Sequence, residues 1–90
     1  MGKHEKLLAR ILNGGSDANV AFSDLCRLLR YLGFAERIAA SHHVFTRPGV
    51  DEMINLQEAG AKAKVYQVRQ VRAILVKHRL GCEAEEGPPE

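Results

Sequence analysis

The stretch FAERIAASHHVFTRPGVDEMINLQ, residues 34–57, decides the fold because its apolar residues recur at about every second position. This alternation is typical of strands with one buried and one exposed face. It predicts strands at 34–39, 42–47 and 50–57, and Pro48-Gly49 predicts a turn between the last two. Three successive strands with short links indicate an antiparallel meander.

The flanking segments have the three-to-four residue spacing of amphipathic helices. Residues 3–13 and 22–32 each place leucines on one stripe and are each followed by glycine, a common helix terminator. We expect Ser23 to cap the second of these helices with its hydroxyl group. Residues 65–80 are predicted to form the longest helix. Its apolar stripe contains Val68, Val71, Ile74, Leu75 and Val76.

The order of these elements predicts an α+β fold. One face of a three-stranded sheet needs cover, and the helices before and after the sheet can both pack there. We therefore expect one domain at residues 1–80, with an α-β-β-β-α core at 23–80 and an extra helix at 3–13. This is the arrangement of a double-stranded-RNA-binding domain. Residues 81–90 are expected to form a flexible acidic tail.

The composition agrees with a single small globular domain. The chain has 90 residues, of which 46% are hydrophobic and 27% charged, which argues against disorder. No apolar run approaches the roughly 18–20 residues that cross a bilayer, so no membrane partner is expected. The first residues lack the apolar stretch of a secretory signal, and a cytoplasmic location is therefore predicted.

The charge of the chain is uneven. The last ten residues contain four of the 11 acidic residues, which leaves seven acidic against 13 basic residues in the preceding part, a formal charge of +6. A basic body favours an anionic partner, and nucleic acid is the most common one.

The segment Ser41-His42-His43-Val44-Phe45 contains the candidate catalytic residue. Phe45 is the best core candidate of its strand, so His43 is expected to face inward and His42 to stand on the open face. An exposed neutral imidazole exchanges protons near pH 7. A surface histidine without a function is the ordinary alternative.

The same geometry argues against metal-dependent chemistry. Adjacent strand residues point to opposite faces, so His42 and His43 cannot readily bind one metal, nor can Ser41 and His42 readily act as nucleophile and base. Cys26 and Cys82 lack the spacing of a zinc or redox pair and are expected to be a core thiol and a tail thiol. We expect no metal and no cofactor.

Basic residues are expected near His42. Arg37 and either Lys62 or Lys64 could reach its side of the molecule and hold a phosphodiester while the imidazole deprotonates a 2′-hydroxyl group. The two lysines precede the last helix, whose N-terminal amides attract anions, although a solvated loop is the simpler alternative. The candidate RNA-binding residues are Arg37, Ser41, Lys62, Lys64, Arg69 and Arg72.

Three segments occur in order within residues 23–80. They are Gly33-Phe34, Ala40-Ser41-His42-His43-Val44-Phe45, and Val68-x-x-Val71-Arg72-x-Ile74-Leu75. Together they resemble the HicA family of toxins from type II toxin–antitoxin modules. The family's strand reads G-S-H-H-x-F, so Ala40 replaces a glycine. The methyl group of alanine disfavours backbone conformations that glycine adopts readily, and it could also prevent a close approach of RNA to the backbone.

The resemblance implies a double-stranded-RNA-binding-like fold and ribosome-independent cleavage of mRNA. It assigns the general base to His42, and it implies inhibition by a HicB-like antitoxin that covers the active site in a hetero-oligomer. The chain would then be an endoribonuclease toxin of the stress response.

Two other function classes remain open. A non-catalytic RNA-binding module of the same fold would use the same basic surface and bind RNA in a salt-sensitive way without cleaving it. A protein-binding domain whose basic face docks an acidic partner would have no affinity for RNA at moderate salt.

Overall fold

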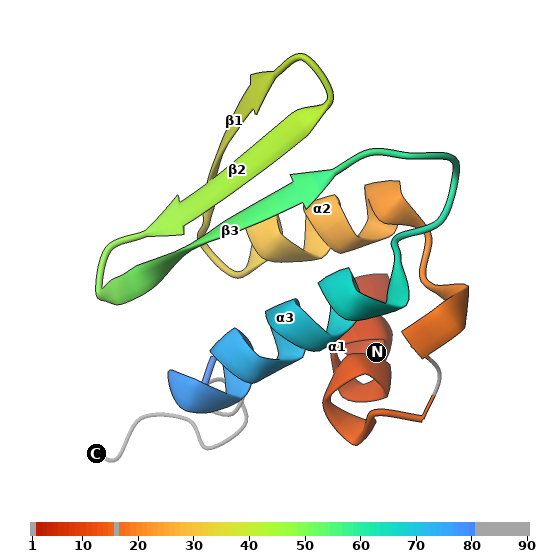
Figure 1. The fold of residues 1–90 in the computed structure, drawn as a ribbon. Helices are drawn as coiled ribbons and strands as arrows, with labels where there is room; N and C mark the ends of the chain where they lie inside the picture. The colour runs from red at the N-terminus through yellow and green to blue at the C-terminus, as the bar shows by residue number, and fades with distance from the viewer. Residues whose placement is uncertain (1, 16, 81–90) are drawn as a thin grey trace.

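The structure is a computed structural model that describes residues 2–15 and 17–80 (Figure 1). Its elements in chain order are α1 (Lys3–Asn13), the 3-10 helix η1 (Asp17–Asn19), α2 (Phe22–Tyr31), β1 (Ala35–Ala39), β2 (His42–Arg47), β3 (Val50–Gln57) and α3 (Val65–Lys77). The predicted α+β class with a three-stranded antiparallel sheet is confirmed. The predicted acidic tail and Cys82 lie outside the described residues.

The sheet has the order β1-β2-β3, as predicted for a meander. Phe45 lies opposite Glu36 on β1 and opposite Ile54 on β3, and these side chains face the helices. Figure 1 shows α2 and α3 on one side of the sheet, and none of the helices in the described residues lies on the other side. The sheet therefore keeps one uncovered face.

The core lies between the sheet and the helices. Each fully buried aliphatic or aromatic side chain contributes about 1.5–3 kcal/mol to folding. Helix α1 adds Leu8 and Ile11 to the same cluster, so the extra helix packs on the rest of the domain. The fully buried residues of the other elements include Leu25, Leu28, Leu29, Phe45, Ile54, Leu56, Val68, Val71 and Leu75.

The turn between β1 and β2 contains a strained residue. Ala39 pairs with His42, so the turn consists of Ala40 and Ser41, and Ala40 has a left-handed φ of 56°. A positive φ at the first of two turn residues is the pattern of type II′ turns, where glycine is usual. An L-residue in this conformation costs about 1–2 kcal/mol. Ala40 thus adopts the positive-φ conformation that was expected to require glycine at this position.

Two helix ends differ from the predictions. Helix α2 begins without a cap from Ser23, because the amide of Phe22 donates to the carbonyl of Ala61 at 2.9 Å and satisfies the helix start from a distant loop. Helix α3 ends at Lys77 rather than at residue 80, because the amide of Leu80 turns back to the carbonyl of Leu75 at 2.9 Å. Within the described ranges, no helix has the length and apolar character needed to cross a membrane.

The stripe predicted for α3 is also wrong at one position. Val76 is 57% exposed, while Leu75 beside it is fully buried. Val76 comes directly after Leu75 in the chain and therefore lies on the solvent-facing side of the helix.

Candidate functional site

His42 stands on the uncovered face of the sheet. Its side chain is exposed, as the sequence predicted, and Nδ1 lies 3.4 Å from Oδ1 of Asn55 on β3. Since the amide oxygen is an acceptor, it favours the tautomer with the proton on Nδ1. The lone pair of the imidazole is then on Nε2.

The strand register determines what surrounds His42. It lies between Ala39 of β1 and Gln57 of β3, and the small Ala39 side chain leaves one side of the imidazole uncrowded. The carbonyl of Gln57 accepts a hydrogen bond of 3.1 Å from the buried Gln67 side chain, which also accepts one of 3.0 Å from the amide of Lys64. Gln67 therefore fixes the start of α3 to the end of β3 beside His42.

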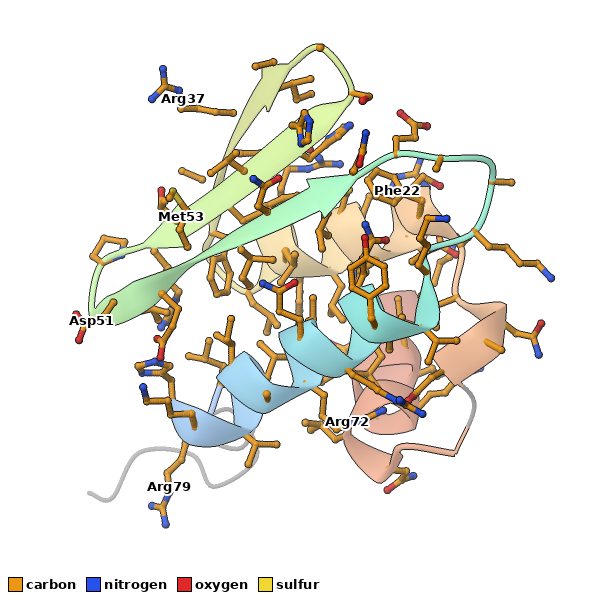
Figure 2. All side chains as sticks on the ribbon, in the orientation of Figure 1. Phe22, Arg37, Asp51, Met53, Arg72 and Arg79 are labelled. Atoms are coloured by element: carbon orange, nitrogen blue, oxygen red, sulfur yellow. The ribbon has the colours of Figure 1, made fainter. Side chains whose placement is uncertain are left out.

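Arg37 shares the open face with His42. It pairs with Val44 and lies two residues from Ala39, which makes it a diagonal neighbour of His42. Diagonal neighbours are about 7–8 Å apart, within the span of an arginine side chain. In Figure 2 the exposed Arg37 side chain projects from β1 into open space. Arg37 is therefore a solvent-facing cation on the same sheet face as His42.

Of the predicted loop residues, Lys62 has a partner other than the His42 region. Residues 61–63 pair with residues 20–22, through hydrogen bonds from Phe22 to Ala61 at 2.9 Å and from Ala63 to Val20 at 2.8 Å. This pairing directs Lys62 to Oδ1 of Asn19, at 3.3 Å, rather than to His42. Lys64 is the exposed N-cap residue of α3. Ser41 lies in the turn before His42, and its carbonyl accepts the amide of Glu58 at 2.9 Å.

The two predicted arginines of α3 bind Asp17 of η1. Arg69 lies 3.6 Å from the Asp17 carboxylate, and Arg72 forms a closer ion pair with it and donates to the carbonyl of Ile11 at 2.8 Å. The Arg72 hydrogen bond is the main cause that lowers the pKa of Asp17 below its ordinary value. These contacts join α3 to η1 and α1, so the two arginines do not belong to the group around His42.

Sequence reasoning missed a polar cluster on the covered face of the sheet. His43 points inward, as predicted, and Nδ1 lies 2.7 Å from the Glu36 carboxylate while its ring meets Phe22 edge-on at 5.0 Å. The Cys26 thiol of α2 completes the cluster. Burial, and then the charge of Glu36, raises the pKa of Cys26 to about 11, so the thiol stays protonated at neutral pH and is not an activated nucleophile.

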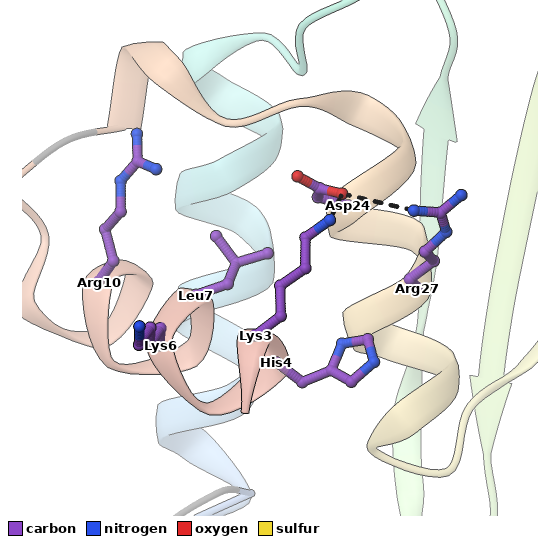
Figure 3. Close-up of a pocket in the computed structure, with 7 residues that line it drawn as sticks. All are labelled: Lys3, His4, Lys6, Leu7, Arg10, Asp24 and Arg27. Carbon is purple, nitrogen blue, oxygen red and sulfur yellow. Dashed lines mark ion pairs between the residues drawn. The ribbon is translucent and has the colours of Figure 1, made fainter. Parts of the chain in front are cut away.

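A second surface feature is a basic hollow between α1 and α2 (Figure 3). Its volume is about 220 Å³. The Asp24 carboxylate lies 3.3 Å from Lys3 and 3.8 Å from Arg27. The hollow is lined by Lys3, His4, Lys6, Leu7, Arg10, Asp24 and Arg27. Four Lys and Arg residues therefore surround one acid, which gives this surface a net positive charge.

In comparisons with known proteins, the chain matches no protein-family model, no curated protein and no solved structure.

Proposed function

We propose that the chain is a metal-independent endoribonuclease, the mRNA-cleaving toxin of a type II toxin–antitoxin module, with His42 as its general base. The observation that carries the proposal is the exposed imidazole on the uncovered sheet face, with Nδ1 facing the Asn55 amide oxygen. Arg37 on the same face supports it, because a phosphodiester needs a nearby cation.

The chemistry uses the 2′-hydroxyl of the substrate. Nε2 of His42 takes the 2′-hydroxyl proton as the 2′-oxygen attacks the adjacent phosphorus. The bond from phosphorus to the 5′-oxygen breaks, and that oxygen takes a proton from water. The products are a 2′,3′-cyclic phosphate and a 5′-hydroxyl end. A positioned general base accelerates such a step about 10²- to 10⁴-fold, and Arg37 would stabilise charge on the phosphate.

Two features of the fold support the family assignment. The order of helices and strands, with one sheet face uncovered, fits the double-stranded-RNA-binding arrangement. The left-handed Ala40 supplies the turn conformation for which the family's G-S-H-H segment uses glycine. On this proposal, a HicB-like antitoxin covers the open face around His42 in a cytoplasmic hetero-oligomer.

The test is cleavage of a defined RNA by the purified protein in the presence of EDTA. We expect 2′,3′-cyclic phosphate ends and no cleavage where the 2′-hydroxyl is replaced by hydrogen. The His42→Ala variant should lose cleavage, while His4→Ala, which changes a half-buried histidine of α1, should retain it. Cleavage at an unchanged rate by His42→Ala would exclude the assignment of His42.

A second candidate is a module that binds RNA without cleaving it. It is favoured by the position of Lys62, Arg69 and Arg72, whose contacts go to η1 and α1 rather than to His42. The basic hollow between α1 and α2 would then hold phosphates. Salt-sensitive RNA binding without products identifies this function, whereas binding of an acidic protein and of no RNA identifies the protein-docking alternative.

A further inference from the structure

Cys26, Glu36 and His43 come from three different elements and meet on the covered side of the sheet. Cys26 lies on α2, Glu36 on β1 and His43 on β2. Glu36 pairs with Phe45, and His43 pairs with Ile38, so Glu36 and His43 are diagonal neighbours on the face that α2 covers. One donor atom from each of the three residues lies within 4.8 Å of the other two.

The donor set matches the ligand preference of zinc. A thiolate, an imidazole nitrogen and a carboxylate oxygen are its usual protein ligands, and three protein ligands leave a fourth position of the tetrahedron free. At metal bonds of about 2.0–2.1 Å, tetrahedral ligand atoms are about 3.3 Å apart. The Glu36 oxygen and His43 Nδ1 are 2.7 Å apart, and the donor atoms of the cluster lie within 4.8 Å of one another. Side-chain rotations that separate Glu36 from His43 and bring the thiol closer would reach the tetrahedral spacing.

The surroundings hold the three donors in place. Cys26 is 4% exposed, and the side chains of His43 and Glu36 are 14% and 10% exposed. Arg30 binds one carboxylate oxygen of Glu36 and leaves the other directed at His43. The edge contact with Phe22 fixes the imidazole ring. Second contacts of this kind orient metal ligands in proteins.

The cluster is also accessible from solvent. A hollow of about 200 Å³ opens over it, lined in part by Cys26, Glu36, His43 and Glu58. The Glu58 carboxylate is 56% exposed and lies 3.7 Å from Nε2 of His43. The hollow gives a metal ion a path of entry, and the Glu58 carboxylate adds negative charge at its mouth.

We infer that Cys26, Glu36 and His43 form a zinc site, with water in the fourth position. The ion replaces the thiol proton and the hydrogen bond between Glu36 and His43, and it ties α2 to β1 and β2. The site lies on the opposite face of the sheet from His42 and does not depend on the proposed cleavage of RNA.

Cobalt(II) is the probe, because its absorption reports a thiolate ligand and a tetrahedral site. The full chain is stripped with EDTA, desalted and titrated with cobalt(II). We expect one equivalent to bind, with a charge-transfer band in the near ultraviolet and intense visible bands. Zinc should displace the cobalt and raise the thermal midpoint of unfolding.

Two cysteine variants form a matched pair. Cys26→Ser should lose the charge-transfer band, while Cys82→Ser should keep it. His43→Gln should weaken zinc binding by about tenfold or more, and His42→Ala should bind zinc as tightly as the wild type. Far-UV circular dichroism of the metal-free variants checks that each one folds.

Three results would overturn the inference. The first is the absence of bound metal in the folded wild type. The second is a charge-transfer band that survives in Cys26→Ser and disappears in Cys82→Ser. The third is an equal affinity of the wild type and of Glu36→Gln for zinc. Because glutamine keeps the shape of the glutamate side chain, this variant tests the site even if Cys26→Ser proves unstable. Loss of RNA cleavage in His42→Ala with zinc binding intact would separate the two proposals.

Discussion

His42 and His43 are consecutive in the chain but lie on opposite faces of the sheet, in different chemical environments. His42 is exposed and has the Asn55 amide oxygen 3.4 Å from its Nδ1. His43 lies inside, 2.7 Å from Glu36 and edge-on to Phe22. The alternation of a strand therefore gives two consecutive histidines an exposed and an enclosed environment.

This separation predicts different effects on stability. His42→Ala should change the free energy of unfolding by less than about 0.5 kcal/mol, because it removes an exposed side chain. His43→Ala should destabilise the metal-free protein by about 1–3 kcal/mol, because it removes the hydrogen bond to the enclosed Glu36 and the contact with Phe22. Urea denaturation in EDTA measures both. Equal effects of the two changes would contradict the assignment of faces.

The turn before His42 predicts a stabilising substitution. Ala40→Gly should raise the free energy of unfolding by about 1 kcal/mol, because glycine adopts the φ of 56° without strain. The matched control is Ala39→Gly, in the neighbouring strand position, which should lower stability by about 0.5–1 kcal/mol. Denaturation midpoints compare the three proteins. A loss of stability in Ala40→Gly would show that the turn differs from the one described.

Local patterns were sufficient to predict most of the fold. The bounds of β2 and β3 follow the alternation of the sequence, and α1 ends just before Gly14, which adopts a left-handed conformation. The inward position of His43 followed from Phe45, since both belong to the same face of one strand. Short-range rules suffice where the neighbours along the chain decide the structure.

These local rules do not predict contacts between segments that are distant in the sequence. Ser23 was predicted to cap α2, but the Ala61 carbonyl takes the amide at the helix start. Lys62 was expected near His42, but the pairing of its loop with residues 20–22 directs it to Asn19. The cluster around Cys26 depends on the docking of α2 on the sheet, and no spacing in the sequence reveals it.

The role proposed for Arg37 at the phosphate predicts a selective loss of activity. Arg37→Gln should lower the rate of RNA cleavage about 10²-fold, because one donor to the reacting phosphate is removed. It should leave stability unchanged, since the side chain is exposed. Arg79→Gln is the control of equal charge, because Arg79 lies far from Arg37 at the end of α3 (Figure 2). Equal losses in both variants would indicate a general charge effect instead of a site at Arg37.

The attachment of β3 to the end of α3 predicts a pH dependence of stability. Hydrogen bonds from Lys77, and then from His78 at 2.7 Å, lower the pKa of Glu52 from its ordinary value of 4.5 to about 2. A carboxyl whose pKa is lowered by folding stabilises the native state above its unfolded pKa. That contribution is complete above pH 4.5 and is lost as the pH falls from 4.5 towards 2.

Glu52→Gln removes this titration and tests it directly. The variant should be less stable than the wild type at pH 6, and the difference should shrink steadily between pH 5 and pH 3 as the wild-type carboxyl takes up a proton in the unfolded state. Urea denaturation at several pH values measures the difference. Asp51→Asn is the control, because it removes an exposed carboxyl at the neighbouring position of β3. A difference between wild type and Glu52→Gln that stays constant across this range would show that the contacts with Lys77 and His78 do not stabilise the charged form of Glu52.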